Sequence, residues 1–282
     1  MQILCLVLEI NQIIQNTDLT VQKRKNRFPD LYLKSFTIII PAYNEEKRIS
    51  PVLNDICRFI SENSLPWDVI AAIDGNDATY DIAESFAETY GFITVDRSHE
   101  RGGKGGAIKR VLPKIDGEFT ILMDADNSIG FPEIVRAVQQ LDKSDAIILS
   151  RYNGKNSIPM LRRLLSRGFN IIVRSISGLN VSDTQSGYKL FRSDLFVNAM
   201  RKVTVTNASY DVPLLYYIKE MGGRITETAA EYTHAGSGKL NPISMAMSFG
   251  ISLVAFRIRN SPLYSHVPQF LIDLYHRKFK WI

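Results

Sequence analysis

Two carboxylates one residue apart have the spacing in this sequence that most directly indicates chemistry. Asp124 and Asp126 end an apolar run, Phe119 to Met123. Because side chains alternate along a strand with a period of two, both carboxylates are expected to project to one side at or just past a strand end. Mg²⁺ and Mn²⁺ take oxygen ligands, and Mg²⁺ commonly keeps one or two carboxylates beside substrate phosphates. The pair predicts a site for Mg²⁺ or Mn²⁺ with a nucleotide diphosphate; the alternative is two turn residues closing a buried strand.

The elements that must position these carboxylates alternate between strands and helices. FTIIIP, from Phe36, has the continuous β-branched character of a strand buried on both faces, and apolar residues from Ile49 to Ile60 recur on one helix face. This alternation predicts βαβ crossovers and an α/β fold with a mostly parallel sheet flanked by helices. The predicted strands cover residues 36–41, 67–73, 92–95, 119–123 and 146–150, and the predicted helices cover 49–60, 80–90, a segment reaching about residue 112 and one begun by Pro132.

Polar residues collect where these strands end. Ligands of such sheets bind beyond the carboxyl ends of the strands. A stacking ring, acceptors for a base and a cation at successive strand ends indicate a nucleotide site, although a single carboxylate there is often only a helix cap. Pro41, Tyr43 and Glu45 follow the first strand, Asp74 the second and Lys104 the third.

The stretch RGGKGGAIKR, from Arg101, is rich in glycine and opens a predicted helix. Its backbone N–H groups are suited to phosphate. The Lys is followed by Gly rather than Ser or Thr, so the stretch is not a Walker A loop, and it does not match the GxGxxG pattern of dinucleotide-binding proteins.

Composition narrows the class of protein. The chain has 282 residues, 45% of them hydrophobic, enough to bury one full core. The net charge of 34 − 29 = +5 suits a phosphate-rich ligand or an anionic membrane face and does not require nucleic acid. Cys5 and Cys57 lack metal-ligand or paired spacing, so a reduced, cytosol-facing compartment is expected. No particular oligomeric state is implied.

Three regions are expected: an N-terminal extension over residues 1–34, a catalytic body over 35–240 and a C-terminal helical part over 241–282. The longest apolar stretch, Ile243 to Phe256, is shorter than the ~20 residues that span a bilayer. It is followed by Arg257 and Arg259, and the tail FLIDLYHRKFKWI mixes aromatic and basic residues. This pattern fits helices that lie peripherally on the cytoplasmic side of a membrane, or a core helix with a packed C-terminal helix.

Seven motifs in order carry a resemblance to a known family. They are FTIIIPAYNEEKRI, IDGNDAT, HERGGKGGAI, DADN, SRY, LSRGFN and DTQSGYKLF. From Phe36 to Arg259 the chain resembles the inverting family 2 glycosyltransferases of GT-A fold, and within them the polyprenyl-phosphate sugar synthases. The glucose branch, which acts on dolichyl phosphate, is more similar than the mannose branch. Ile73, Asn76 and Asn127 depart from the family pattern, and Asn127 beside the metal is a place where sugar choice could change.

The resemblance implies roles for the donor-side residues. Tyr43, Glu45 and Asp74 would hold the nucleoside of a nucleotide-sugar donor. UDP-glucose is favoured, and UDP-N-acetylglucosamine, another UDP-sugar or GDP-mannose are the alternatives. Pro41 would shape the loop, and Lys104 would lie near the same nucleotide. Asp124 and Asp126 would place Mg²⁺ or Mn²⁺ on the diphosphate.

The implied acceptor is a polyprenyl or dolichyl phosphate. Because a phosphate monoester with a second pKa of about 6 is already largely ionised at neutral pH, no general base is required. Arg151, Arg163, Arg167 and Lys189 are the candidates for binding its phosphate, although at least one arginine of RRLLSRGFN is expected in solvent. Asp126, Arg151 and Asp183 are the predicted catalytic residues. Asp183 would orient the acceptor, with turn capping as the alternative.

The loop Gly236–Lys239 resembles the family's loop near the acceptor, and it is expected either to close over the donor or to form a plain turn.

Other activities remain open at this point. A nucleotidyltransferase would share the sheet and a metal-binding Asp, but its glycine-rich signature should follow the first strand, where this chain has AYNEE. A sugar-nucleotide-binding scaffold without activity is the non-enzymatic alternative.

Overall fold

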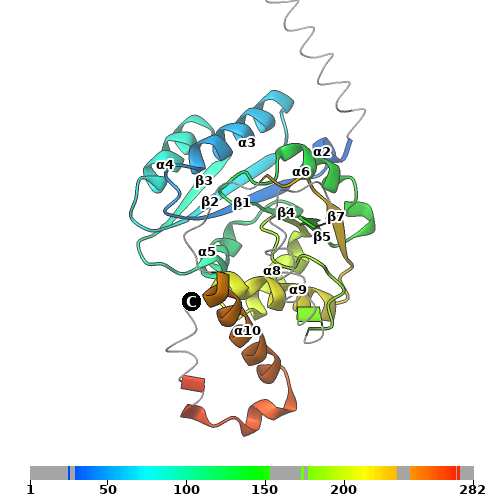
Figure 1. Ribbon diagram of the computed structural model, residues 1–282. Helices are drawn as coiled ribbons and strands as arrows, with labels where there is room; N and C mark the ends of the chain where they lie inside the picture. Colours follow the sequence, from blue (N-terminus) through cyan, green and yellow to red (C-terminus); the bar gives the residue numbers. More distant parts are fainter. Residues whose placement is uncertain are drawn as a thin grey trace, which may run out of the picture.

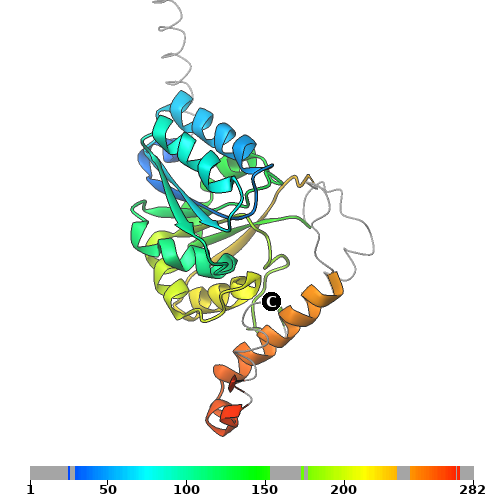
Figure 2. The same cartoon turned by 90° about the vertical axis from the view of Figure 1, so that its left-hand side faces the viewer.

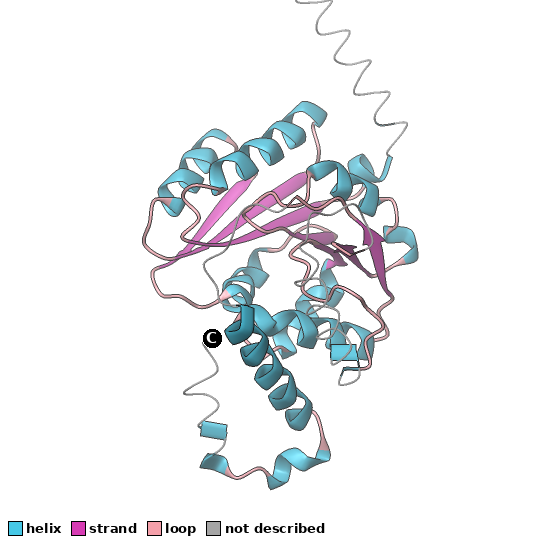
Figure 3. Cartoon of the chain, viewed as in Figure 1, coloured by secondary structure: helices cyan, strands magenta, loops and turns pink. Residues whose placement is uncertain are grey.

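A single sheet organises the computed structural model, which describes residues 25, 29–152, 173–174, 177–233, 242–270 and 272–273. Within these residues the sheet has seven strands, with helices on both faces (Figures 1 and 3). The strands are β1 (Phe36–Tyr43), β2 (Trp67–Asp74), β3 (Ile93–Ser98), β4 (Phe119–Leu122), β5 (Ala146–Ser150), β6 (Lys189–Arg192) and β7 (Ile225–Ala229).

The strand order is β3-β2-β1-β4-β6-β5-β7. Strands β1, β2, β3 and β4 are parallel, β7 is parallel to β5, and β6 is antiparallel to both β4 and β5. The predicted α/β fold with a mostly parallel sheet is confirmed. Strands β6 and β7 are not among the predicted strands. The sequence pattern does not indicate them, because β6 has only four residues and β7, ITETA, has a polar composition.

Helices cover both faces of the sheet because its central strands are apolar on both faces. In β1, Phe36, Ile38 and Ile40 belong to one buried cluster and Ile39 to the other. The first cluster joins α2 (Pro29–Leu33), α3 (Ile49–Asn63), α4 (Thr79–Thr89) and α6 (Phe131–Val138); the second joins α5 (Lys104–Val111), α8 (Ser193–Lys202) and α9 (Asp211–Glu220). Short 3₁₀ helices cover Leu112–Lys114, Leu141–Lys143, Ala208–Tyr210 and Pro262–His266.

The packed body begins earlier than residue 35. Leu31 of α2 is buried in the first cluster, and its carbonyl accepts a hydrogen bond from Trp67 Nε1 at 3.0 Å. Phe36 packs against Trp67 with ring centroids 4.4 Å apart. The last residues of the predicted extension are thus part of the core.

Helix α10 (Pro242–Arg259) lies on the side of the sheet that carries α8 and α9 (Figures 1 and 2). Phe256 contacts Tyr216 and Tyr217 of α9 edge to face, at centroid distances of 5.2 and 5.9 Å. Leu253 is buried at the same contact, so one face of α10 is anchored to the body. Among the described residues, no helix combines the length and the apolarity needed to cross a membrane.

Candidate active site

The two carboxylates predicted to bind a cation lie directly after β4. Asp124 and Asp126 are partly exposed, whereas Ala125 between them is buried. Asp126 Oδ1 accepts hydrogen bonds from the backbone N–H of Ser128 at 3.0 Å and from the Tyr188 hydroxyl at 3.5 Å. The carboxylates are therefore held at the carboxyl edge of the sheet and remain accessible to a ligand.

Lys104 supplies a positive charge to this pair. It is the first residue of α5 rather than part of the preceding loop, and its Nζ donates to Asp124 Oδ1 at 2.5 Å. Burial raises the pKa of Asp124, but the charge and hydrogen bond of Lys104, with the charges of Lys189 and Arg151, outweigh burial and hold that pKa below its usual value. Asp124 is thus kept ionised by three cations.

Gly187 leaves the space that the Asp124 side chain occupies. A Cβ built at position 187 would lie 1.7 Å from Asp124 Oδ2 and 2.1 Å from Asp124 Cγ. Side chains larger than hydrogen at position 187 therefore cannot coexist with this carboxylate. Gly187 and Tyr188 belong to the motif DTQSGYKLF, so one segment contacts both carboxylates.

Arg151 and Asp183 form a tightly bonded pair at the end of β5. Asp183 Oδ2 accepts from the backbone N–H and from Nε of Arg151, both at 2.9 Å, and its Oδ1 accepts from Nη2 at 2.7 Å. Burial alone would lower the pKa of Arg151, but the charge and hydrogen bonds of Asp183 outweigh burial and raise that pKa above its usual value. The guanidinium therefore stays charged. Asp183 is 1% exposed and both its oxygens bond to Arg151, so this carboxylate holds the arginine side chain in place.

The other predicted acceptor ligands lie elsewhere or outside the described residues. Lys189 is fully buried, with its Nζ 2.6 Å from Asp211 Oδ1 and a further bond to the Ser186 carbonyl. Burial lowers its pKa more than Asp211 raises it. Lys189 is thus an internal charge behind Asp124 rather than a group open to an acceptor. Arg163 and Arg167 are outside the described residues, as is the loop 236–239.

On the nucleoside side, Tyr43 is open to solvent. The side chain is 42% exposed, and the guanidinium of Arg101 lies 4.4 Å from its ring centroid. Pro41 lies within β1, two residues before it. This ring at the end of β1 is suited to stacking by a planar base. Arg101 was not among the predicted ligands, although it opens the glycine-rich motif.

Asp74 has a different environment from the one predicted. It is 2% exposed, Oδ2 accepts from the backbone N–H of Gly102 at 2.7 Å, and Oδ1 accepts from Arg110 Nη1 at 3.0 Å. Both oxygens therefore hold the glycine-rich loop in place.

Glu45 is paired with Arg48 at 2.6 Å, and its backbone N–H donates to Thr79 Oγ1 at 2.8 Å. Burial is the main cause that raises the pKa of Glu45; Arg48 opposes it, and the charges of Asp126 and Asp124 add to it. The loop after β1 thus lies within electrostatic range of the carboxylate pair.

Asn127 stands where the family pattern has Gly because its backbone is left-handed, with φ of 53°. Asn tolerates this conformation better than most residues. Its Nδ2 donates a hydrogen bond to Asp55 Oδ2 of α3 at 3.0 Å. The Asn127 amide is therefore bonded to a helix and not to either carboxylate of the pair.

Asp96 bonds to Arg110, which also bonds to Asp74, and its carboxylate should make the stability of the fold depend on pH. Burial raises its pKa, but hydrogen bonds from Lys114 (2.7 Å) and Arg110 outweigh burial, so the folded-state pKa lies below the ordinary 3.8. A lowered folded pKa stabilises the protein above about pH 4, and this contribution is lost as pH falls through the lowered value. We expect Asp96→Asn to lower the free energy of unfolding by about 1–3 kcal/mol at pH 7. Urea denaturation should show a constant difference from wild type above about pH 4 and a shrinking difference as the pH falls below that value; a pH-independent difference would contradict this.

Sequence similarity assigns the family. A model described as glycosyl transferase family 2 matches residues 37–198, more than half of the chain. The chain belongs to glycosyl transferase family 2. The resemblance carried by the seven motifs is thereby confirmed, and the protein is a glycosyltransferase.

Individual relatives narrow the comparison. The chain is 28% identical over 257 residues to a dolichyl-phosphate beta-glucosyltransferase of Dictyostelium discoideum, covering 84% of this chain and 77% of the relative. Proteins of the same name from Drosophila melanogaster and Homo sapiens are 28% and 26% identical, covering 79% and 86% of this chain and 74% and 81% of the relatives.

Solved structures share the fold. Glucosyl-3-phosphoglycerate synthase from Mycobacterium tuberculosis, in complex with Mn²⁺, UDP and glucosyl-3-phosphoglycerate, superposes with a TM-score of 0.64 at 17% identity, covering 82% of each chain. Mannosyl-3-phosphoglycerate synthase from Rubrobacter xylanophilus superposes with a TM-score of 0.61 at 16% identity, covering 86% of this chain and 79% of the other. The GT-A type fold expected from the motifs is confirmed.

Proposed function

We propose that this glycosyltransferase transfers a hexose, with UDP-glucose as the favoured donor, to dolichyl or another polyprenyl phosphate with inversion. The observation that carries the proposal is the environment of Asp124. It is a partly exposed carboxylate next to Asp126, bonded to Lys104 and within range of Arg151. Acids and cations therefore meet at one strand edge, as a negatively charged donor and a negatively charged acceptor both require. The names of the relatives support dolichyl phosphate as the acceptor.

The carboxylate pair fits a divalent cation. Asp124 and Asp126, both partly exposed at the carboxyl edge of the sheet, would be its two oxygen ligands from the protein. Two carboxylates with the remaining positions left to phosphates and water is the arrangement that Mg²⁺ prefers. When bound there, Mg²⁺ or Mn²⁺ supplies positive charge to the diphosphate leaving group. The Mn²⁺ and UDP of the mycobacterial structure agree with this assignment.

The chain's own residues perform the remaining steps. Lys104 offers a second positive charge to the departing diphosphate, and Tyr43 offers its exposed ring to the base. Arg151, held by Asp183, would bind the acceptor phosphate, for which a guanidinium gives bidentate, permanently charged recognition. Because this phosphate is already ionised at neutral pH, positioning replaces proton removal. Attack opposite the nucleotide would convert an α-linked donor into a β-linked product.

A direct assay tests the proposal. Purified protein is incubated with Mn²⁺, a short polyprenyl phosphate and, in turn, UDP-glucose, UDP-N-acetylglucosamine and GDP-mannose, and products are identified by mass and anomeric NMR. A β-linked hexosyl phosphate lipid is expected from a UDP-hexose, together with UDP. Chelator should abolish it, and the free polyprenol should not replace its phosphate.

Other products would assign another activity. Release of UMP would indicate transfer of a sugar 1-phosphate, and formation of UTP and a sugar 1-phosphate when pyrophosphate is added would indicate a nucleotidyltransferase. Transfer to 3-phosphoglycerate instead of the lipid would indicate a water-soluble acceptor. Nucleotide-sugar binding without turnover would indicate a scaffold. Each of these results would overturn the proposal.

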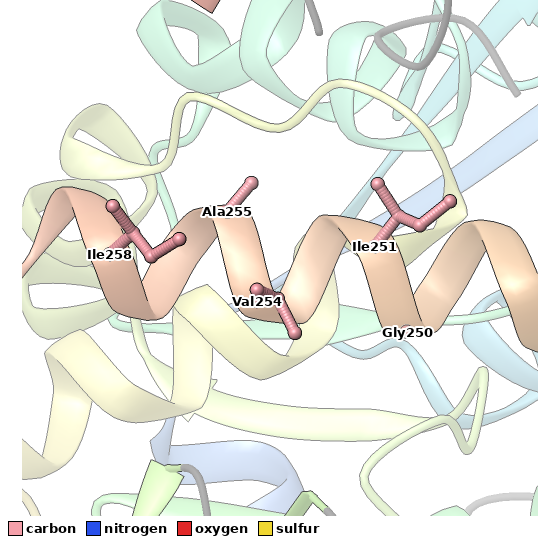
Figure 4. Close-up of a pocket in the computed structure, with 5 residues that line it drawn as sticks. All are labelled: Gly250, Ile251, Val254, Ala255 and Ile258. Atoms are coloured by element: carbon pink, nitrogen blue, oxygen red, sulfur yellow. The ribbon is translucent and has the colours of Figure 1, made fainter. Parts of the chain in front are cut away.

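The outer face of α10 supports a lipid acceptor and a peripheral position on a membrane. Gly250, Ile251, Val254, Ala255 and Ile258 line a shallow apolar hollow on this helix (Figure 4). Val254 is 49% exposed. With about 100° between successive residues, the exposed Arg257 and Arg259 fall on the two borders of this face. An apolar strip flanked by cations is suited to anionic lipid headgroups above an acyl boundary.

Val254→Asp is expected to weaken binding to vesicles of phosphatidylcholine and phosphatidylserine by about tenfold or more, because a buried Val contributes roughly 1.5–3 kcal/mol and a carboxylate is repelled by anionic lipid. Sedimentation with the vesicles measures the change. Leu33→Asp is the matched control, since Leu33 is 80% exposed on α2, away from α10. Equal loss in both variants, or no loss in either, would contradict a specific membrane-facing helix.

A further inference from the structure

Glu227, in the middle of edge strand β7, accepts hydrogen bonds from three donors in a distant part of the chain. Its carboxylate accepts from the backbone N–H of Ser182 at 2.8 Å, from the Ser182 hydroxyl at 2.9 Å and from the backbone N–H of Asp183 at 2.7 Å. Hydrogen bonds from N–H groups to a carboxylate are stronger than those between neutral groups. Glu227 therefore fixes the backbone of Ser182 and of Asp183, the residue that contacts Arg151.

The next link runs from Asp183 to Arg151. The Asp183 carboxylate accepts three hydrogen bonds from Arg151, which come from its backbone N–H, Nε and Nη2. The position of the guanidinium thus depends on the Asp183 carboxylate, and the position of that carboxylate depends on Glu227. Two carboxylates act in series on one arginine.

A role in stability alone explains the choice of Glu at this position poorly. Glu is depleted in strands, and its neighbours on β7 are Thr226 and Thr228. Glu227 has no ion pair with any Lys or Arg among the residues that the structure describes. Its carboxylate instead accepts hydrogen bonds from two backbone N–H groups and one hydroxyl, and these bonds orient residues 182 and 183.

The chain beyond β7 approaches the carboxylate pair as well. Tyr232 pairs with Ile129, and the backbone N–H of Thr233 donates to the Ser128 carbonyl at 2.9 Å. The Tyr232 ring centroid is 5.9 Å from the guanidinium carbon of Arg151. One segment therefore borders both Arg151 and the loop that carries Asp126.

We propose that Glu227 is a positioning residue for the acceptor phosphate, acting through residues 182–183 on Arg151. This inference rests on the proposed function, in which Arg151 binds that phosphate. Glu227 itself touches neither substrate. Its contribution is the orientation of the guanidinium before the acceptor arrives.

Glu227→Gln tests the inference with little change in volume. One carboxylate oxygen becomes an NH₂ group facing N–H donors, so the backbone at 182–183 must shift. We expect KM for polyprenyl phosphate to rise about tenfold, by analogy with outer partners of a ligand-binding group, while KM for the nucleotide sugar stays within about twofold. Thr228→Val is the matched control on the same strand, because Thr228 bonds to Gln140 (3.1 Å) and not to residues 182–183. A rise in both KM values, or in neither, would overturn the inference.

A second measurement does not depend on the reaction. The Nε–H signal of Arg151, assigned by its loss in Arg151→Lys, should exchange slowly with water because it is bonded to Asp183. Glu227→Gln should speed this exchange about tenfold, and Thr228→Val should leave it unchanged. Failure of wild type to glycosylate the lipid phosphate would refute the proposed function alone, whereas unchanged exchange in Glu227→Gln would refute the positioning role. If Glu227→Gln does not fold, Ser182→Ala decides: a rise of about twofold in the acceptor KM supports the role, and an unchanged KM refutes it.

Discussion

Asp126→Asn is expected to lower kcat by about a thousandfold, because one of the two oxygen donors for the cation loses its charge while the shape of the site is kept. The asparagine oxygen can still accept from Ser128 and Tyr188, the two groups that bond to Asp126. Asp126 is a better target than Asp124, whose replacement would leave Lys104 without its partner.

The loss should have two signatures beyond activity. Mn²⁺ affinity, followed by electron paramagnetic resonance, should fall by at least tenfold, and the free energy of unfolding should change by less than about 0.5 kcal/mol. Asp194→Asn, at an exposed acid on α8, is the control for a simple loss of charge. Activity within tenfold of wild type would contradict a metal-binding role for Asp126.

Gly187→Ala is expected to lower activity by about a hundredfold or more. The added methyl group would lie 1.7 Å from Asp124 Oδ2, so the carboxylate has to move by more than an ångström or the backbone has to shift. Displacements of about 1 Å in a catalytic site can reduce the rate by about a hundredfold. Mn²⁺ affinity should fall along with activity, because the moved group is a proposed ligand.

The control for this substitution is Gly130→Ala. Gly130 follows the carboxylate loop, and a Cβ there meets nothing closer than Pro132 Cδ at 3.6 Å. Gly130→Ala should keep its activity within about twofold. Wild-type activity in Gly187→Ala would show that Asp124 does not need the position seen in the structure.

The sequence predicts the sheet and the strand-end residues because both depend on local pattern. A period of two explains why Asp124 and Asp126 are found from the sequence alone, and an apolar strand on both faces explains β1. Tyr43 is found for the same reason, since it directly follows an apolar run.

Side-chain contacts between residues far apart in the chain cannot be predicted from local sequence pattern. Whether Asp74 faces a base or the backbone of Gly102 depends on contacts 28 residues apart, and Lys189 is decided by Asp211, 22 residues away. Glu227 bonds to residues 44 and 45 positions earlier, in a strand whose letters ITETA indicate only a polar edge. Gly187 lies inside the motif that contains Asp183 and Lys189. Its importance comes from a steric contact with Asp124, which only the three-dimensional structure reveals.

The antiparallel strand β6 has a consequence for protein engineering. Because β6 inserts between β4 and β5, the segment leading into it crosses the carboxyl edge and touches Arg151, Asp124 and Asp126 in turn. Chimaeras that exchange acceptor preference between relatives would therefore have to transplant residues 182–189 together with the β7 residue that supports them. A graft of the arginine alone would retain the recipient's geometry.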